Sequence, residues 1–438
     1  MARSTPRSSR AAASRPRIQV APRAALRALT WPIVITLLVL ASAAVAVDPI
    51  WDAATLDAIG EARLDFTAGY LSIAPISSVL DTLTLLTVGQ HIAILLSVIV
   101  LFAANRVRLA RRRDVVLWRE LLAAAGLLAV FLVVYGSVAI MPRPMAQLVT
   151  SDATIITLDF HSHTKYSHDG RGGWNEEDVR AWHRAAGFDA VYITDHATFE
   201  GAERGIAGNS GQAGEGTIVL QGLEAVDRGE HVNILSAGRR YKGLTTLDLR
   251  DVDDQALALA DLIRGTSPIL IETIPGNLSK LSSTAPNVAP SVDAIEIVDG
   301  SPRGLSQGRR ERARIVRLAD SLNLALVTGS DNHGWGRAAP GWTMLRIPGW
   351  RGMPTDSLSR RIEEILRIGR RQATRVIERR IADGTSPIAL VFALPAVAWR
   401  MFTTLGADER VMWLVWAWGI VAITRGFRAY LRQSPTAV

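Results

Sequence analysis

The sequence predicts an α/β domain with a mainly parallel sheet, placed between membrane-spanning helices. Short apolar runs alternate with helical patterns across residues 151–348, which is typical of parallel α/β domains. Long uncharged apolar runs flank this region. Six of the eight histidines lie in four short segments that also contain carboxylates, near the ends of the expected strands.

The composition limits the classes of site that the chain can hold. Its 438 residues suffice for two or three domains. It has no cysteine, which excludes disulfides and thiolate metal sites. The net charge of +8 is carried almost wholly by arginine, since only three lysines occur. These arginines cluster beside apolar runs, which favours the orientation of a membrane protein over nucleic-acid binding.

The N-terminal part predicts a membrane region with three transmembrane helices over 28–141. The apolar runs cover 28–47, 82–105 and 121–141, and each reaches the roughly 20 residues that cross a bilayer as a helix. The arginine-rich segment 1–27 before them is expected to be a disordered arm. The first run begins too late and is too long for a signal peptide, so we interpret it as a retained span.

The C-terminal part predicts a second membrane region over 386–424, with one or two helices. Its apolar runs, 386–399 and 411–424, are shorter, and two short spans are favoured over one span with a surface helix or a re-entrant hairpin. Residues 355–382 carry apolar residues at helical spacing among many arginines. This pattern predicts an amphipathic helix on the membrane surface or against the domain.

The arginine distribution predicts an integral protein of a bacterial-type inner or plasma membrane with the middle domain outside the cytoplasm. Seven arginines precede the first run and six lie in 106–119, whereas loop 48–81 has one arginine and six acids. The positive-inside rule therefore puts 142–385 on the extracytoplasmic side. Nine arginines in 351–380 oppose this orientation, but long domains cross membranes largely regardless of charge.

The middle region contains seven apolar runs that predict strands: TIITLDF, AVYITD, TIVLQGLE, HVNILSA, PILIETI, VDAIEIVD and LALVTGSD. Helical patterns between them predict helices over 175–187, 247–265 and 306–323. Nearly every histidine and carboxylate cluster falls at the carboxyl end of a strand or just after it. Parallel α/β folds place their sites at that end.

His161 and His163 alternate along an extended segment, so both side chains point to one face and can bind one metal ion. Either His168 or Asp169 can return to that site across a short turn. Further imidazoles and carboxylates follow other strands: His196, Glu224, His231, Asp331 and His333. Neutral imidazole with carboxylate is the ligand set of zinc, manganese or iron.

The four segments resemble the motifs of the polymerase and histidinol phosphatase (PHP) family. HSHTKYSHDG resembles the opening HxHTxxSDG motif, and TDH at 194–196 resembles the second motif. GLE at 222–224 followed by His231 resembles the third, and GSDNH at 329–333 resembles GSDxH. The resemblance covers about 150–335, less than half of the chain.

This resemblance implies a distorted (β/α)7 TIM-like barrel over 150–348 that binds two or three divalent metal ions and hydrolyses phosphate esters. Carried over by position, the metal ligands would be His161, His163, His168, Asp169, His196, Glu224, His231, Asp331 and His333. Glu224 would bridge two ions and would act in catalysis with His196 and His231. Asp195 would orient His196.

Two departures from the family pattern affect the metal count. Ser-His-Asp-Gly stands where relatives have Ser-Asp-Gly, so either His168 or Asp169 can take the acidic position. The usual Ala-His-Pro is replaced by ETIPGN, with Ile274 where a histidine is expected. Two ions are then the default, unless another group such as Glu272 fills the third site.

The favoured function is a membrane-anchored phosphoesterase that hydrolyses a phosphorylated small molecule by a metal-bridged hydroxide. Arg303 and Lys165 are candidates for binding the phosphate, and Glu296 ends a strand near the site. The alternatives are a membrane protein that binds a phosphorylated ligand without cleaving it, and a scavenging nuclease. Nucleic acid is the less favoured partner, because the domain lacks an aromatic and basic strip for single strands.

Overall fold

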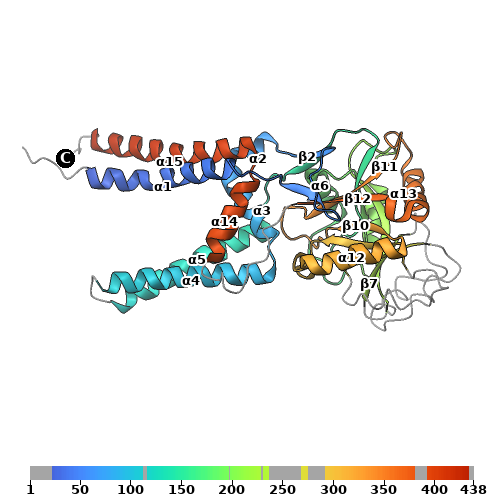
Figure 1. Ribbon diagram of the computed structural model, residues 1–438, viewed down its shortest axis with the longest axis horizontal. Helices are drawn as coiled ribbons and strands as arrows, with labels where there is room; N and C mark the ends of the chain where they lie inside the picture. The colour runs from blue at the N-terminus through green and yellow to red at the C-terminus, as the bar shows by residue number, and fades with distance from the viewer. Residues whose placement is uncertain are drawn as a thin grey trace, which may run out of the picture.

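The computed structural model describes residues 22–111, 116–196, 198–227, 230–235, 268–274, 292–379 and 392–433. Its two parts lie end to end: long helices form one part and a curled sheet with its covering helices forms the other (Figure 1). The helix expected over 247–265 lies outside the described residues.

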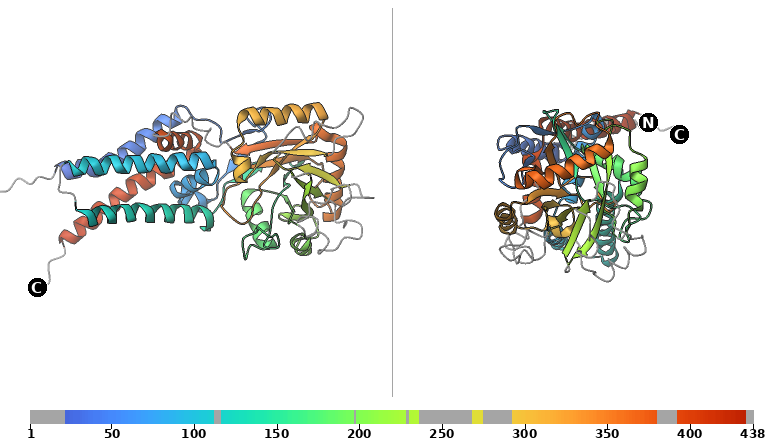
Figure 2. Two further views of the ribbon diagram at one scale, coloured as in Figure 1. Left: turned by 90° about the horizontal axis from the view of Figure 1, so that it is seen from below. Right: turned by 90° about the vertical axis from the view of Figure 1, so that its right-hand side faces the viewer.

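Four long helices extend away from the sheet: α1 (Pro22–Ala43), α4 (Val88–Ala110), α5 (Leu117–Ile140) and α15 (Ala407–Gln433) (Figures 1 and 2). α1 lies alongside α15. Among the described helices, α4 and α5 are the two that are long and apolar enough to cross a membrane. α1 contributes a shorter apolar stretch, Leu29–Ala44.

Short helices lie where the long ones meet the sheet: α2 (Ala68–Ser72), α3 (Ala74–Thr84) and α14 (Ala393–Thr404). With 12 residues, α14 is shorter than the roughly 20 that a span requires. The described part of 386–424 contains α14 and most of the length of α15, and the number of C-terminal spans stays a prediction. α15 carries the chain back to the end where α1 begins (Figure 1).

The second part is built on a ten-stranded sheet with the order β1-β12-β11-β4-β5-β6-β7-β8-β9-β10. The seven predicted strands are all present: β4 (Ile155–Asp159), β5 (Ala190–Ile193), β6 (Ile218–Asp227), β7 (Glu230–Leu235), β8 (Ile269–Glu272), β9 (Ala294–Asp299) and β10 (Ala325–Gly329). The sheet is completed by β1 (Ile50–Asp52), β11 (Gly341–Arg346) and β12 (Thr374–Arg379). Strands β2 (Ala62–Asp65) and β3 (Gln147–Thr150) form a separate pair.

The predicted (β/α)7 TIM-like barrel is wrong: the sheet is mixed and curls as a half-barrel. β7 runs antiparallel to both β6 and β8, and β11 runs antiparallel to β4 and β12. The reason is connection length. Only residues 228–229 separate β6 from β7, whereas a parallel neighbour needs a crossover of a dozen or more residues.

Helices cover the outside of the sheet: α6 (Glu176–Ala186), α7 (Glu200–Ala207), α12 (Arg309–Leu322) and α13 (Thr355–Gly369), with the short α11 (Pro302–Leu305) after β9. α6 and α12 confirm the helices predicted over 175–187 and 306–323. α6 begins at an Asn175 capping box and ends at Gly187, whose φ of +85° suits glycine.

Residues 355–382 do not form one helix. α13 ends at Gly369, and its buried Leu358, Ile362 and Leu366 pack into the sheet's core rather than against a membrane. β12 follows, because Val376 and Ile377 are buried among the strands while Arg375 pairs with Asp52 and Arg379 pairs with the buried Asp81. Residues 380–382 lie outside the described part.

A buried charge cluster joins the helices to the sheet. Asp81 of α3 accepts a hydrogen bond from Arg143, which follows α5, and one of 2.7 Å from Arg379 of β12. The Tyr70 hydroxyl lies 3.1 Å from Asp81 and 3.3 Å from Glu409 of α15. The cluster therefore links helices from both ends of the chain to an inner strand.

Candidate metal centre

Segments that follow β4 and β10 pair with each other and set the first two histidines. The His163 N–H donates to the Asn332 carbonyl at 3.1 Å, and the Asp331 N–H donates to the His161 carbonyl at 2.9 Å. The pairing keeps 161–163 extended, so both imidazoles face one side, as predicted from the alternation. It also brings Asp331 beside them.

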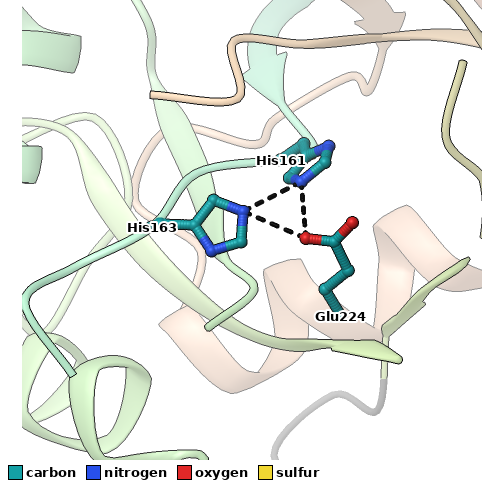
Figure 3. A group of neighbouring side chains, drawn as sticks. All are labelled: His161, His163 and Glu224. Atoms are coloured by element: carbon teal, nitrogen blue, oxygen red, sulfur yellow. Dashed lines mark hydrogen bonds and ion pairs between the residues drawn. The ribbon is translucent and has the colours of Figure 1, made fainter. Parts of the chain in front are cut away.

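Three ligand atoms gather in the spacing that one divalent ion requires, and a fourth, from Asp331, lies close to two of them. The Nε2 atoms of His161 and His163 are 3.0 Å apart, and they lie 3.0 and 3.1 Å from the Glu224 Oε2 (Figure 3). The Asp331 Oδ1 lies 3.3 and 3.4 Å from the same nitrogens. Ligands at about 2.0–2.1 Å around a tetrahedral ion are about 3.3 Å apart. The residues therefore fit a metal ion.

Glu224 faces a second set of histidines with the same carboxylate. Its Oε2 lies 3.3 Å from the His196 Nε2, and its Oε1 lies 2.6 Å from the His231 Nδ1. β6 and β7 pair in register around this point, which positions Glu224 and His231 from neighbouring strands. A carboxylate with imidazoles on both oxygens has the arrangement of a ligand shared by two ions.

A third group consists of His163, Asp169 and His333. The Asp169 Oδ2 lies 3.0 Å from the His333 Nε2 and 3.7 Å from the His196 Nε2. His168 is exposed, and its ring centroid lies 4.8 Å from that of His196. The sequence left open whether His168 or Asp169 is the ligand. Asp169 is the one that belongs to a ligand group among the described residues.

The charges in this cluster depend on one another. Burial works to lower the pKa of His163, but hydrogen bonds to Asp331 and Glu224 outweigh it and raise that pKa to about 10. Burial works to raise the pKa of Glu224, yet the histidines, led by His161, hold it well below its ordinary value. The buried carboxylates thus require positive charge beside them, which divalent cations supply when bound.

Two carboxylates of β9 support His161 from its other side. The Glu296 Oε1 lies 3.0 Å from the His161 Nδ1, and the Asp299 Oδ2 lies 3.9 Å from it. Burial and the neighbouring Asp331 raise the pKa of Asp299 to about 6. Asp299 was not predicted from the sequence as a site residue, although it ends the predicted strand β9. A carboxylate on the second nitrogen of a ligating histidine fixes the ring's tautomer and orientation.

Two other buried acids hold the loops rather than the ligands. Asp195 accepts hydrogen bonds of 2.6 Å from both the backbone N–H and the hydroxyl of Thr164, which tie it to the HxHT segment. Asp159 accepts from the backbone N–H groups of His161 and Ser330 and lies 2.7 Å from the His183 Nε2. Asp159 therefore fixes the two segments that carry the first ligand set.

The candidate phosphate-binding residues contact side chains outside the ligand groups of the described residues. The Arg303 side chain is about half exposed and lies 3.5 Å from Glu230. The Lys165 ammonium lies 5.0 Å from the ring of Tyr166. Ile274 and Glu272 are both buried, and Glu272 belongs to none of the ligand groups among the described residues.

Comparisons with known proteins give only distant similarity. No family model and no curated protein matches the sequence. PsfC from Pseudomonas syringae is 18% identical, with a TM-score of 0.31, over 57% of this chain and 99% of that one. A chain described as a metal-dependent phosphoesterase from Bifidobacterium adolescentis is 17% identical, with a TM-score of 0.28, over 48% and 96%. A lesion-specific endonuclease from Pyrococcus furiosus is 12% identical, with a TM-score of 0.28, over 44% and 53%.

Proposed function

We propose that this chain is a membrane-anchored phosphoesterase that depends on divalent metal ions. The observation that carries the proposal is the position of Glu224, whose Oε2 faces His161, His163 and His196 and whose Oε1 faces His231. Metal ions in such paired sites neutralise phosphate oxygens, activate a water molecule and stabilise the leaving oxygen. His161, His163 and Asp331 would hold one ion with Glu224, and His196 and His231 would hold the other.

The protein's own groups supply orientation and proton transfer. Glu296 holds the His161 ring from behind, so the Nε2 atom points into the site. His231 contacts Glu224 and has a side chain that is 47% exposed. When it is not bound to an ion, it is therefore placed to pass a proton between the buried site and the departing alcohol. Arg303 and Lys165 are proposed to meet the phosphate from the rim.

The first test measures metal content and hydrolysis together on the purified full chain. We expect bound zinc, manganese or iron by elemental analysis, and release of p-nitrophenol from p-nitrophenyl phosphate. Chelation should abolish the rate and added manganese or zinc should restore it. Tight metal binding without turnover would contradict the enzyme and favour a protein that only binds phosphorylated ligands. Cleavage of oligonucleotides but not of phosphomonoesters would favour a nuclease.

Membrane anchoring is proposed from the exposure of α5. Helix α5 has 24 residues, most of them apolar, and the rest of the described chain buries none of them. A core helix of a soluble protein would be covered, so α5 requires an apolar surrounding. α4 ends at Ala110 and α5 begins at Leu117, both at the end of the helical part that is farthest from the sheet (Figure 1). The sequence over 106–119 carries the arginines that predict the cytoplasmic side. We therefore propose that the sheet lies outside the cytoplasm.

The absence of cysteine from the sequence permits a direct test of this orientation. Gln212 on the sheet part and Arg111 at the end of α4 are both exposed. In intact cells, a membrane-impermeant maleimide should label the Gln212→Cys variant and leave Arg111→Cys unlabelled until the cells are opened. The reverse labelling pattern would overturn the assignment.

A further inference from the structure

A groove of about 660 Å³ runs from the metal centre to the membrane helices. Asp169, Asp331 and His333 line one end of it. Val88 in the first turn of α4 and Val138 near the end of α5 line the other. The groove therefore connects the candidate catalytic groups to the part of the chain that requires an apolar surrounding.

The loop after β10 builds this connection. It carries Asp331 and His333, and three residues later the Gly336 N–H donates to the Ala139 carbonyl of α5 at 3.0 Å. Gly336 has a φ of +73°, and a β-carbon there would lie 2.8 Å from Thr84 of α3. Since only glycine fits this close approach, the metal-binding loop is fixed directly against the ends of the membrane helices.

The groove changes from charged to apolar along its length. Beyond the carboxylates and His333, its walls include leucines of α3 and the residues that follow it, and valines of α4 and α5. The His91 Nδ1 and the Tyr135 hydroxyl, 3.1 Å apart, join α4 to α5 beside it. The groove therefore has a charged end and an apolar end, which match the phosphate head and the hydrocarbon tail of a single ligand.

The rim of the groove has the residues of a membrane interface. Trp335, also in the loop after β10, is 53% exposed and lines the groove. The Arg171 guanidinium lies 5.5 Å from its ring centroid and 5.3 Å from that of Trp174. Tryptophan prefers the boundary between bilayer and water, and a nearby arginine attracts an anionic head group.

We infer that the substrate is a membrane-embedded phosphomonoester: its hydrocarbon chain enters between α4 and α5, and its phosphate reaches the metal centre along the groove. This inference rests on the proposed phosphoesterase function and names its substrate class. In the reaction, a water oxygen bonds to phosphorus as the P–O bond to the lipid alcohol breaks. A proton from that water passes to the departing oxygen, so the products are a lipid alcohol and inorganic phosphate.

The test uses a series of n-alkyl phosphates from ethyl to octyl, with the full chain in lipid nanodiscs. Hydrolysis is followed by phosphate release, and kcat/KM should rise up to about four-fold for each added methylene that enters the groove. Most of the rise should appear in KM, because tail burial is the same in the ground state and the transition state. A flat dependence on chain length, with short phosphates hydrolysed, would overturn the lipid substrate and leave the phosphoesterase intact.

Matched variants locate the tail. Val88 is 50% exposed and lines the groove, whereas Ile92, one turn along α4, is 53% exposed and does not line it. Val88→Trp should fill the groove and flatten the chain-length dependence, while Ile92→Trp should keep it. An unchanged slope in Val88→Trp would overturn the groove as the tail's site.

A binding experiment separates this inference from the catalytic proposal. Non-hydrolysable n-alkyl phosphonates should bind the manganese-loaded chain more tightly as the tail lengthens, and Val88→Trp should remove that trend. Phosphonate binding with this pattern, together with no hydrolysis of any phosphate, would overturn the enzyme and support the groove. Binding that is independent of tail length would overturn the groove whatever the activity.

Discussion

Replacement of Glu224 by glutamine is expected to lower both metal affinity and phosphoester hydrolysis by more than about 100-fold. Loss of a group that only supports a ligand costs about 10–100-fold in metal affinity, and Glu224 is placed to ligate directly. Its Oε2 lies within 3.3 Å of three imidazole nitrogens, and its Oε1 lies 2.6 Å from the fourth. Glutamine keeps the shape but loses the charge and one of the two oxygens.

The measurement is metal content by elemental analysis after dialysis, with p-nitrophenyl phosphate turnover on the same sample. Glu215→Gln is the matched control, because Glu215 is exposed and lies outside the ligand groups. It should keep the parent's metal content and rate. If Glu224→Gln retained as much metal as the parent, the bridging role and the paired metal site would both be excluded.

The second large effect is expected in stability. Asp81→Asn should lower the free energy of unfolding by about 3–5 kcal/mol, the usual cost of removing one partner from a buried ion pair. The side chains of Arg143 and Asp81 are 0% and 2% exposed, and Arg379 lies 2.7 Å from the same carboxylate. The substitution would leave two guanidinium groups buried without their shared anion.

Denaturant unfolding of the purified chain in detergent measures this loss. Asp320→Asn is the control, since Asp320 pairs with Arg371 at 2.6 Å on the surface, where its side chain is 54% exposed. An exposed pair contributes about 0–1 kcal/mol, so this variant should unfold close to the parent. Equal losses in the two variants would contradict the view that the buried cluster fastens the helices to the sheet.

Much of the site could be predicted because its residues lie in strands or just after them. The runs that form β4, β6 and β10 are apolar enough to identify as strands, and polar residues within or after them lie together in the structure. Because His161 and His163 alternate along an extended segment, their side chains could be predicted to point to the same side. Asp299 was missed because one carboxylate after a strand has no distinctive spacing. Its role depends on β9 and β10 lying side by side, which only pairing establishes.

The sequence by itself predicted much of the local structure: seven strands, the helices α6 and α12, and the apolar runs that form α4 and α5. It also identified side chains that the structure gathers into candidate ligand groups. Periodicity and side-chain chemistry are properties of neighbouring residues, so they can be read along the chain. Only the tertiary structure decided the antiparallel edge formed by β11 and β12 and the packing of α15 alongside α1. It also decided that the metal centre opens toward α4 and α5. These features depend on which distant segments pack together, and no local pattern specifies that choice.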